Sequence, residues 1–228
     1  MLVFIAGMPR SGSTFSFNVA REVLSRRGKT HHAAVASLAG IDTDAKHFIL
    51  KAHDADEEMT RRIMAGDMKA IVTLRRRPED AVASWMTAFG HGLDETLGVF
   101  RGWFAFYERI KPQALLVDYD EIDTRPAEAA GRIARHLVPE IGMTEVINLH
   151  RRFANAKADV FEKTHAMQAA DAGVQDVGFS YYDTATFYHR RHVQSLTSRS
   201  ASDILDAEQI GRIRRDLAPH IDGEGYLR

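Results

Sequence analysis

The sequence predicts an α/β fold of three layers, with a central parallel sheet covered by helices on both faces and a helical C-terminal portion. Short apolar runs of strand length alternate with longer stretches of helical periodicity, which is the order of elements in a parallel sheet. The first run, Leu2–Ala6, is apolar throughout, as expected of a strand buried on both faces.

The composition is that of an ordinary globular protein. The chain has 228 residues, of which 45% are hydrophobic and 27% are charged, and this length suits a single domain over residues 1–228. Its 30 Lys and Arg against 31 Asp and Glu give no overall field for nucleic acid, so any anion must be bound by local basic clusters. The absence of cysteine excludes disulfides and thiolate catalysis.

We expect neither a membrane-spanning segment nor a signal peptide in this sequence. No apolar run approaches the about 18 residues that span a bilayer, and the apolar start is short and leads directly into Pro9 and Arg10. We therefore expect a cytoplasmic protein. The oligomeric state stays open, a homodimer included.

The expected elements follow one another in a regular order. After the first strand, an apolar stripe indicates a helix over Phe15–Arg26. Further apolar runs predict strands, and periodic or proline-initiated stretches predict helices. In chain order these are a strand at His47–Lys51, a helix at Glu57–Ala65, a strand at Ala70–Leu74, helices at Pro78–Phe89 and Leu93–Ile110, a strand at Ala114–Asp118 and a helix around Pro126–Leu137.

The strand signal fades after about Thr144. We expect mainly helices from there on, ending in one over Ala207–Leu217, and an irregular stretch rich in aromatic residues over Asp171–Ser202. That stretch is a candidate acceptor pocket or lid, with five aromatic residues that have little regular structure to bury them: Phe179, Tyr181, Tyr182, Phe187 and Tyr188.

A phosphate-binding loop is predicted between the first strand and the first helix. Gly7 and Gly12 have the G-x-x-x-x-G spacing of a P-loop, so the fold is predicted to be of the P-loop type. Small residues let successive backbone N–H groups face an anion, and the helix N-terminus adds the positive end of its dipole. Ser13 stands in place of the usual lysine, and Arg10 supplies the positive charge instead. Because that lysine and Mg²⁺ together neutralise ATP phosphates in P-loop kinases, its loss favours transfer of a less charged group, without a metal.

A second set of residues with phosphate-binding chemistry follows the strand at Ala70–Leu74. Asp80 and Ser84 are four residues apart and share one helix face, while Arg76 leaves the carboxyl end of the strand, where open sheets bind ligands. A guanidinium makes bidentate bonds to phosphate, and a serine hydroxyl adds a donor. Two such sites in one chain suit a ligand that carries two phosphate groups.

The two motifs resemble those of the sulfotransferases that use 3′-phosphoadenosine-5′-phosphosulfate (PAPS). Pro9-Arg10-Ser11-Gly12-Ser13-Thr14 matches the family's P-[KR]-[ST]-G-[ST]-[ST] loop, and Arg76, Asp80 and Ser84 have the spacing of its 3′-phosphate motif. The resemblance implies that Arg10 contacts the phosphosulfate bridge, that Ser11 to Thr14 hold the 5′-phosphate, and that Phe15 stacks on adenine. It also implies PAPS as co-substrate, adenosine 3′,5′-bisphosphate (PAP) as product, and no metal.

A third, partial match concerns the proton acceptor. Lys51 and His53 resemble the family's Lys-Thr-His sequence at the end of a middle strand, although the threonine is missing. The resemblance implies that His53 takes the proton of the acceptor and that Lys51 assists at the sulfuryl oxygens. A nearby carboxylate, from Asp54, Asp56 or Glu57, is the alternative base.

A fourth match is more distant. Arg190 and Arg191 stand where the family has a basic, glycine-containing segment that folds over the 3′-phosphate, but neither glycine is present. The resemblance implies that one of these arginines reaches the 3′-phosphate, and the missing glycines put that contact in doubt.

The function predicted is in-line sulfuryl transfer from PAPS to a hydroxyl, less favourably an amine, of a small-molecule or carbohydrate acceptor. Two alternatives stay open: a small-metabolite kinase that uses ATP and Mg²⁺, and a non-catalytic nucleotide-binding sensor. The 11 histidines contain no metal-binding motif, so no metal site is expected.

Overall fold

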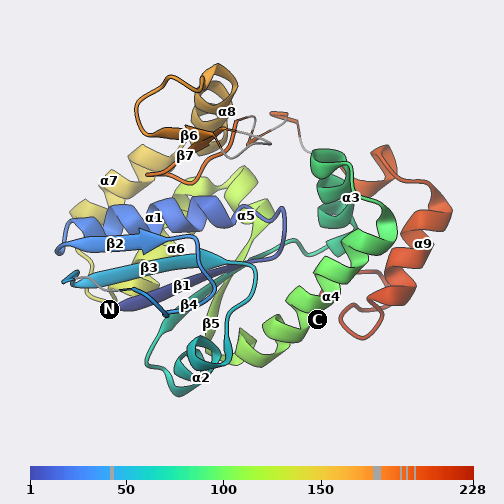
Figure 1. The fold of residues 1–228 in the computed structure, drawn as a ribbon, viewed down its shortest axis with the longest axis horizontal. Helices are drawn as coiled ribbons and strands as arrows, with labels where there is room; N and C mark the ends of the chain where they lie inside the picture. The colour runs from blue at the N-terminus through green and yellow to red at the C-terminus, as the bar shows by residue number, and fades with distance from the viewer. Residues whose placement is uncertain (42–43, 177–180, 191, 194, 198) are drawn as a thin grey trace.

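A single parallel sheet forms the centre of the molecule (Figure 1). The structure, a computed structural model, describes residues 1–41, 44–176, 181–190, 192–193, 195–197 and 199–228. Five strands are ordered β2-β3-β1-β4-β5, and all neighbours are parallel. They are β1 (Leu2–Gly7), β2 (Thr30–Ala33), β3 (His47–Ala52), β4 (Lys69–Leu74) and β5 (Ala114–Asp118). The prediction of a central parallel sheet is confirmed.

Alternating side chains along β1 divide the core into two. Phe4 and Ala6 face one side and Val3 and Ile5 the other, as the two-residue period of a strand requires. The first side is covered by α2 (Glu57–Ala65), α3 (Pro78–Phe89), α4 (Leu93–Ile110) and α9 (Ala207–Asp216). The second is covered by α1 (Ser13–Ser25), α6 (Pro126–Leu137) and α7 (Met143–Phe153). In Figure 1, α1 and α7 lie above the sheet and α2 lies below it, so the three predicted layers are confirmed.

Four predicted helices have the observed bounds, namely α2, α3, α4 and α6. The elements that the sequence did not reveal are short or marginal in pattern. The edge strand β2 reads Thr-His-His-Ala and is only half-buried, so it lacks the apolar run of the other strands. The others are α5 (Tyr119–Thr124) and an antiparallel pair of β6 (Val174–Asp176) and β7 (Tyr181–Asp183) inside the stretch expected to be irregular. The helix α8 (Ala156–Ala166) lies in the region after Thr144 that was expected to be mainly helical.

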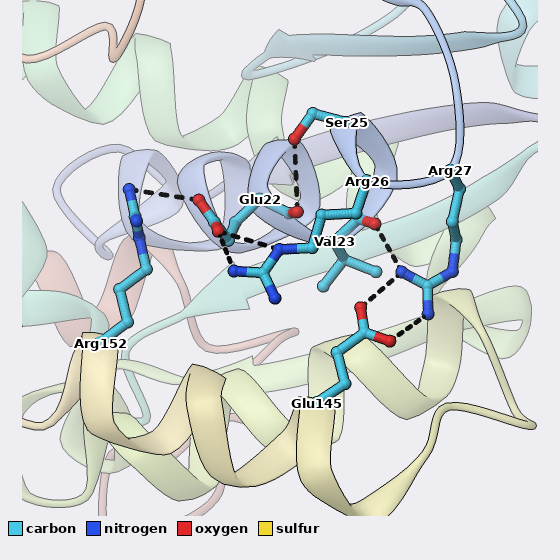
Figure 2. A network of polar contacts seen from close by, with 7 residues as sticks. All are labelled: Glu22, Val23, Ser25, Arg26, Arg27, Glu145 and Arg152. Carbon is cyan, nitrogen blue, oxygen red and sulfur yellow. Dashed lines mark hydrogen bonds and ion pairs between the residues drawn. The ribbon is translucent and has the colours of Figure 1, made fainter.

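Charged side chains join α1 to α7 (Figure 2). Arg27 donates two hydrogen bonds to the Glu145 carboxylate, at 2.6 and 2.7 Å, and this pairing lowers the pKa of Glu145. Glu22 pairs with Arg26 on its own helix and with Arg152 on α7. The contacts fix the end of α1 that lies opposite the predicted phosphate loop.

No helix among the described residues has the length and apolar character needed to cross a membrane.

Candidate active site

The loop between β1 and α1 is fastened to the sheet by Ser11. The buried Ser11 hydroxyl bonds to Met8 O at 2.7 Å, to Thr73 O at 2.9 Å and to Thr73 Oγ1 at 2.8 Å. The Ser11 amide donates to Met8 O at 3.1 Å. Ser11 therefore holds the loop against the end of β4, and its hydroxyl is already engaged within the protein.

Two glycines and one arginine give the loop its shape. A Cβ on Gly7 would lie 2.3 Å from Ser13 Cβ, so only glycine permits this close approach. Gly12 has a φ of 82° and Arg10 a φ of 63°. A left-handed conformation is costly for a residue with a side chain, and such residues occur at functional sites. The turn aims the Arg10 side chain at the cavity described next.

A cavity of about 410 Å³ lies where the parallel strands end. Its walls include the loop after β1, the residues after β3 and β4, and Tyr119 after β5. The carboxyl edge of the sheet is where open α/β folds bind ligands. Of the residues predicted to act on a nucleotide or acceptor, those that line it are Arg10, Ser11, Gly12, Ser13, Thr14, Phe15, Lys51, His53 and Ser84.

His53 has a defined orientation in the cavity wall. Its Nδ1 lies 2.7 Å from Gly7 O, and because a carbonyl oxygen only accepts, Nδ1 carries the proton and Nε2 is left as the acceptor. Burial lowers the pKa of His53, as does the neighbouring Lys51, in spite of the bond to Gly7. The ring is therefore neutral at neutral pH, as a general base must be.

Two cations share this end of the cavity. Arg10 Nε donates to Ser84 Oγ at 3.2 Å, which joins the two predicted phosphate motifs. Burial, and then Arg75, lower the pKa of Arg10, although an arginine stays charged at any ordinary pH. Burial lowers the pKa of Lys51 to about 8. An anion bound between Arg10 and Lys51 would stabilise the charged form of both side chains.

Arg76, in contrast, does not reach the cavity. Its side chain is 69% exposed and is paired with Asp118. The neighbouring Arg75 lines the cavity, donates to Arg10 O at 3.0 Å and lies 3.9 Å above the Tyr119 ring. Beyond the end of β4, Arg75 is therefore directed toward the cavity and Tyr119, and Arg76 toward solvent and Asp118. The structure does not bring Arg76 to the place that its spacing predicts.

Arg190 does not reach the cavity. Arg190 is not among its lining residues, and its guanidinium lies 5.6 Å from the centre of the Tyr181 ring. Arg191 lies outside the described residues.

Of the late aromatic residues, Tyr188 lines the cavity. Phe187 instead stacks on Phe17 of α1 at 4.4 Å, and Tyr182 stacks on Phe187 at 5.4 Å. Phe179 lies outside the described residues. The segment is thus held to α1 by aromatic packing and contributes one of its described tyrosines to the cavity.

The alternative bases are placed elsewhere. Asp56 caps α2 by accepting from Met59 N at 2.8 Å, Glu57 pairs with Arg109 at 2.7 Å, and neither these two carboxylates nor the exposed Asp54 line the cavity. Of the predicted bases, it is His53 that lines the cavity. Among the described residues, no three His, Asp or Glu side chains gather to hold a metal ion.

Sequence reasoning missed an aromatic wall next to Ser84. Trp85 and Phe89 line the cavity with ring centres 4.4 Å apart, and Trp85 stands 6.0 Å from His53, edge to face. The indole N–H donates to His91 Nδ1 at 3.2 Å. The signal available in the sequence was a tryptophan directly after Ser84, followed four residues later by a phenylalanine. His189 and His192 also line the cavity, and no motif pointed to them.

The fold is similar to that of sulfotransferase structures. Retinol dehydratase in complex with androsterone and inactive cofactor PAP aligns with 95% of this chain and 79% of its own, at a TM-score of 0.59 and 14% identity. Mouse sulfotransferase SULT7A1 complexed with PAP aligns with 95% of this chain and 83% of its own, at a TM-score of 0.58 and 13% identity. No protein-family model matches this sequence, and no curated protein does. The resemblance seen in the sequence is confirmed at the level of the fold, which this chain shares with these two proteins solved with PAP.

Proposed function

We propose that the protein is a single-domain sulfotransferase that moves the sulfuryl group of PAPS to an acceptor hydroxyl, with PAP as the other product. One observation carries the proposal. Arg10, Lys51 and His53 come from two separate segments and meet in one cavity at the carboxyl edge of a sulfotransferase fold.

The chemistry assigns each of the three a role. The acceptor oxygen attacks sulfur as the bond from sulfur to the bridging oxygen breaks, and the electron pair stays on the 5′-phosphate of PAP. His53 Nε2 takes the acceptor's proton. Arg10 stabilises the charge that develops on the bridging oxygen, and Lys51 faces the sulfuryl oxygens. Groups fixed in advance where charge develops provide most of the catalysis in such reactions.

The charges around the cavity favour a hydroxyl over an amine. The cations Arg10, Lys51 and Arg75 all line it. Among its described lining residues the carboxylates are Asp80 and Asp123, and both have partners: Asp80 accepts from Ala201 N at 2.6 Å and Asp123 pairs with Lys157 at 2.5 Å. An ammonium group would be desolvated beside cations without a carboxylate of its own. A neutral hydroxyl meets no such penalty.

The aromatic wall suits an acceptor with an apolar face. Trp85 and Phe89 offer ring faces against which a planar small molecule or the C–H face of a sugar can pack. We place the acceptor between this wall and His53.

Ligand-induced stabilisation tests the nucleotide assignment. A ligand that binds only the folded chain stabilises it by about 2.7 kcal/mol at 100 times its Kd, so PAP in the presence of EDTA should raise the Tm. ATP with Mg²⁺ is the matched comparison. A rise with ATP and Mg²⁺ but not with PAP would contradict the sulfotransferase proposal and support a kinase.

Turnover tests the remaining alternative. PAPS is incubated with the protein and a panel of phenols, aliphatic alcohols, sugars and amines, and PAP release is followed. We expect release with hydroxyl compounds and little with amines. Tight PAP binding without transfer to any member of the panel would favour a nucleotide sensor.

A further inference from the structure

Two histidines of the segment after β7 lie in the wall of the same cavity. The rings of His189 and His192 are nearly parallel, at 12°, with centres 6.1 Å apart, and both residues line the cavity. His192 also packs edge to face on Tyr188 at 5.0 Å.

The backbone around these histidines is held by hydrogen bonds. His192 N donates to His189 O at 3.0 Å, and Asp183 N donates to Tyr188 O at 2.9 Å. The two rings are thus presented together on one turn.

Their electrostatic surroundings are those of an anion site. Burial is the main cause that lowers the pKa of both histidines, and the charges of Arg10 and Lys51 lower it further. The two described carboxylates of the cavity are engaged elsewhere, Asp80 by Ala201 N and Asp123 by Lys157. Two cations and two neutral rings therefore share a place where an anion would be stabilised.

The same two cations indicate which part of the donor lies there. Arg10 and Lys51, the groups that influence both histidines, are those proposed to face the bridging oxygen and the sulfuryl group. Arg75 donates to Arg10 O and stacks on Tyr119 instead. The histidines belong to the sulfuryl end of the cavity rather than to the 3′-phosphate end.

We propose that His189 and His192 form the second half of the sulfuryl site, each donating a ring N–H to a non-bridging oxygen of the group in transfer. This inference rests on the proposed function and extends it to residues outside the sequence motifs. Sulfuryl oxygens only accept hydrogen bonds, and a neutral imidazole carries one N–H donor, so the pair matches the group without adding a charge. The two histidines take no part in bond making or proton transfer.

Replacement of His192 tests the proposal because PAP lacks the sulfuryl group. His192→Leu removes the donor, whereas His192→Gln keeps an N–H. His165→Gln, on α8 and outside the cavity, is the matched control. The measurements are the Kd of PAP by calorimetry, kcat at saturating PAPS with a hydroxyl acceptor, and the Tm of each variant.

We expect His192→Leu to leave the Kd of PAP within about twofold and to lower kcat at least about tenfold, since loss of a donor to developing charge acts on the transferring group. His192→Gln should recover most of the rate, and the control should match the wild type. His189→Leu, measured in parallel, should show the same separation of kcat from Kd, which keeps the test decisive if one variant folds poorly.

Two results would overturn the inference: an unchanged kcat in both leucine variants, or a loss of PAP affinity as large as the loss of rate, which would place the histidines on the nucleotide. Failure of the wild-type chain to bind PAP is a separate result, visible before any variant is made, and would overturn the proposed function together with this extension.

Discussion

The loop after β1 and the segment after β7 meet at one cavity, but they are held in place by different means. The loop continues directly from the central strand β1, and the buried Ser11 hydroxyl bonds to Met8 within the loop and fastens it to Thr73 of β4. The late segment has only a pair of three-residue strands, and so short a hairpin is marginally stable by itself. The comparison indicates that the sheet preforms the loop side of the cavity, whereas the side formed by the late segment depends on a few side-chain contacts.

Asp183 is the main polar anchor of the late segment. Its Oδ1 accepts from the backbone N–H groups of Ala185 and Thr186, both at 2.9 Å, and its Oδ2 pairs with Lys163 of α8 at 2.7 Å. Burial would raise the pKa of Asp183, but the Lys163 ammonium and the Thr186 donors outweigh it and lower the pKa. The anchor is a partly exposed ion pair, unlike the buried hydroxyl that fixes the loop.

The largest expected effect lies on the sheet side, at His53. His53→Gln removes the proposed base and should lower kcat about 10²–10⁴-fold, the range usual for general-base catalysis, with the Kd of PAP unchanged. In the wild type, the lowered pKa of His53 keeps the ring neutral below its ordinary pKa of 6.5. On the acid side, the rate should therefore fall at a lower pH than it would for a histidine with the ordinary pKa of 6.5. A full rate in His53→Gln would remove His53 from the mechanism and return the role to a carboxylate.

The adjacent arginines after β4 give the next largest effect and form a matched pair. Arg75→Ala should weaken PAP binding about 10–100-fold, as expected for the loss of a hydrogen bond to a charged group worth about 1.5–3 kcal/mol. Arg76→Ala should change the Kd of PAP little, because its side chain faces solvent and Asp118. The Kd values by calorimetry decide the matter. If Arg76→Ala weakened PAP binding more than Arg75→Ala does, Arg76 would again be the phosphate-binding arginine, as the sequence spacing predicts.

Ser11→Ala probes how firmly the loop is attached. It removes the hydroxyl from three buried contacts and should lower the free energy of unfolding by about 1–3 kcal/mol. Urea denaturation measures the change. Ser25→Ala, which removes an exposed hydroxyl at the other end of α1, serves as the control and should have almost no effect.

The smallest effect is expected at the late segment. Lys163→Met removes an ion pair whose lysine side chain is 50% exposed, and such pairs contribute at most about 1 kcal/mol. The same urea measurement applies. A loss as large as that of Ser11→Ala would break the comparison, because the late segment would then be fastened as firmly as the loop.

The functional residues on the sheet side of the cavity were predictable because they lie at or just beyond the carboxyl ends of strands. The sequence placed Arg10, Lys51 and His53 directly after apolar runs, and parallel strands bring their carboxyl ends to one edge. Trp85, His189 and His192 escaped prediction because they carry no motif. The two histidines enter the cavity only through a turn that no local pattern specifies.

The sequence by itself determined the three-layer arrangement. Val3 and Ile5 face one side of the sheet and Phe4 and Ala6 face the other, and because all four are apolar, each face requires a core. The sequence also determined the form of the loop, because only glycine fits at Gly7. Only the tertiary structure decided that Arg75 rather than Arg76 faces the cavity, and that two late histidines line it as well. The physical reason is that burial patterns and glycine sterics act over a few neighbouring residues. The direction of a side chain beyond a strand end, by contrast, is set by partners such as Tyr119 and Asp118, more than 40 positions away.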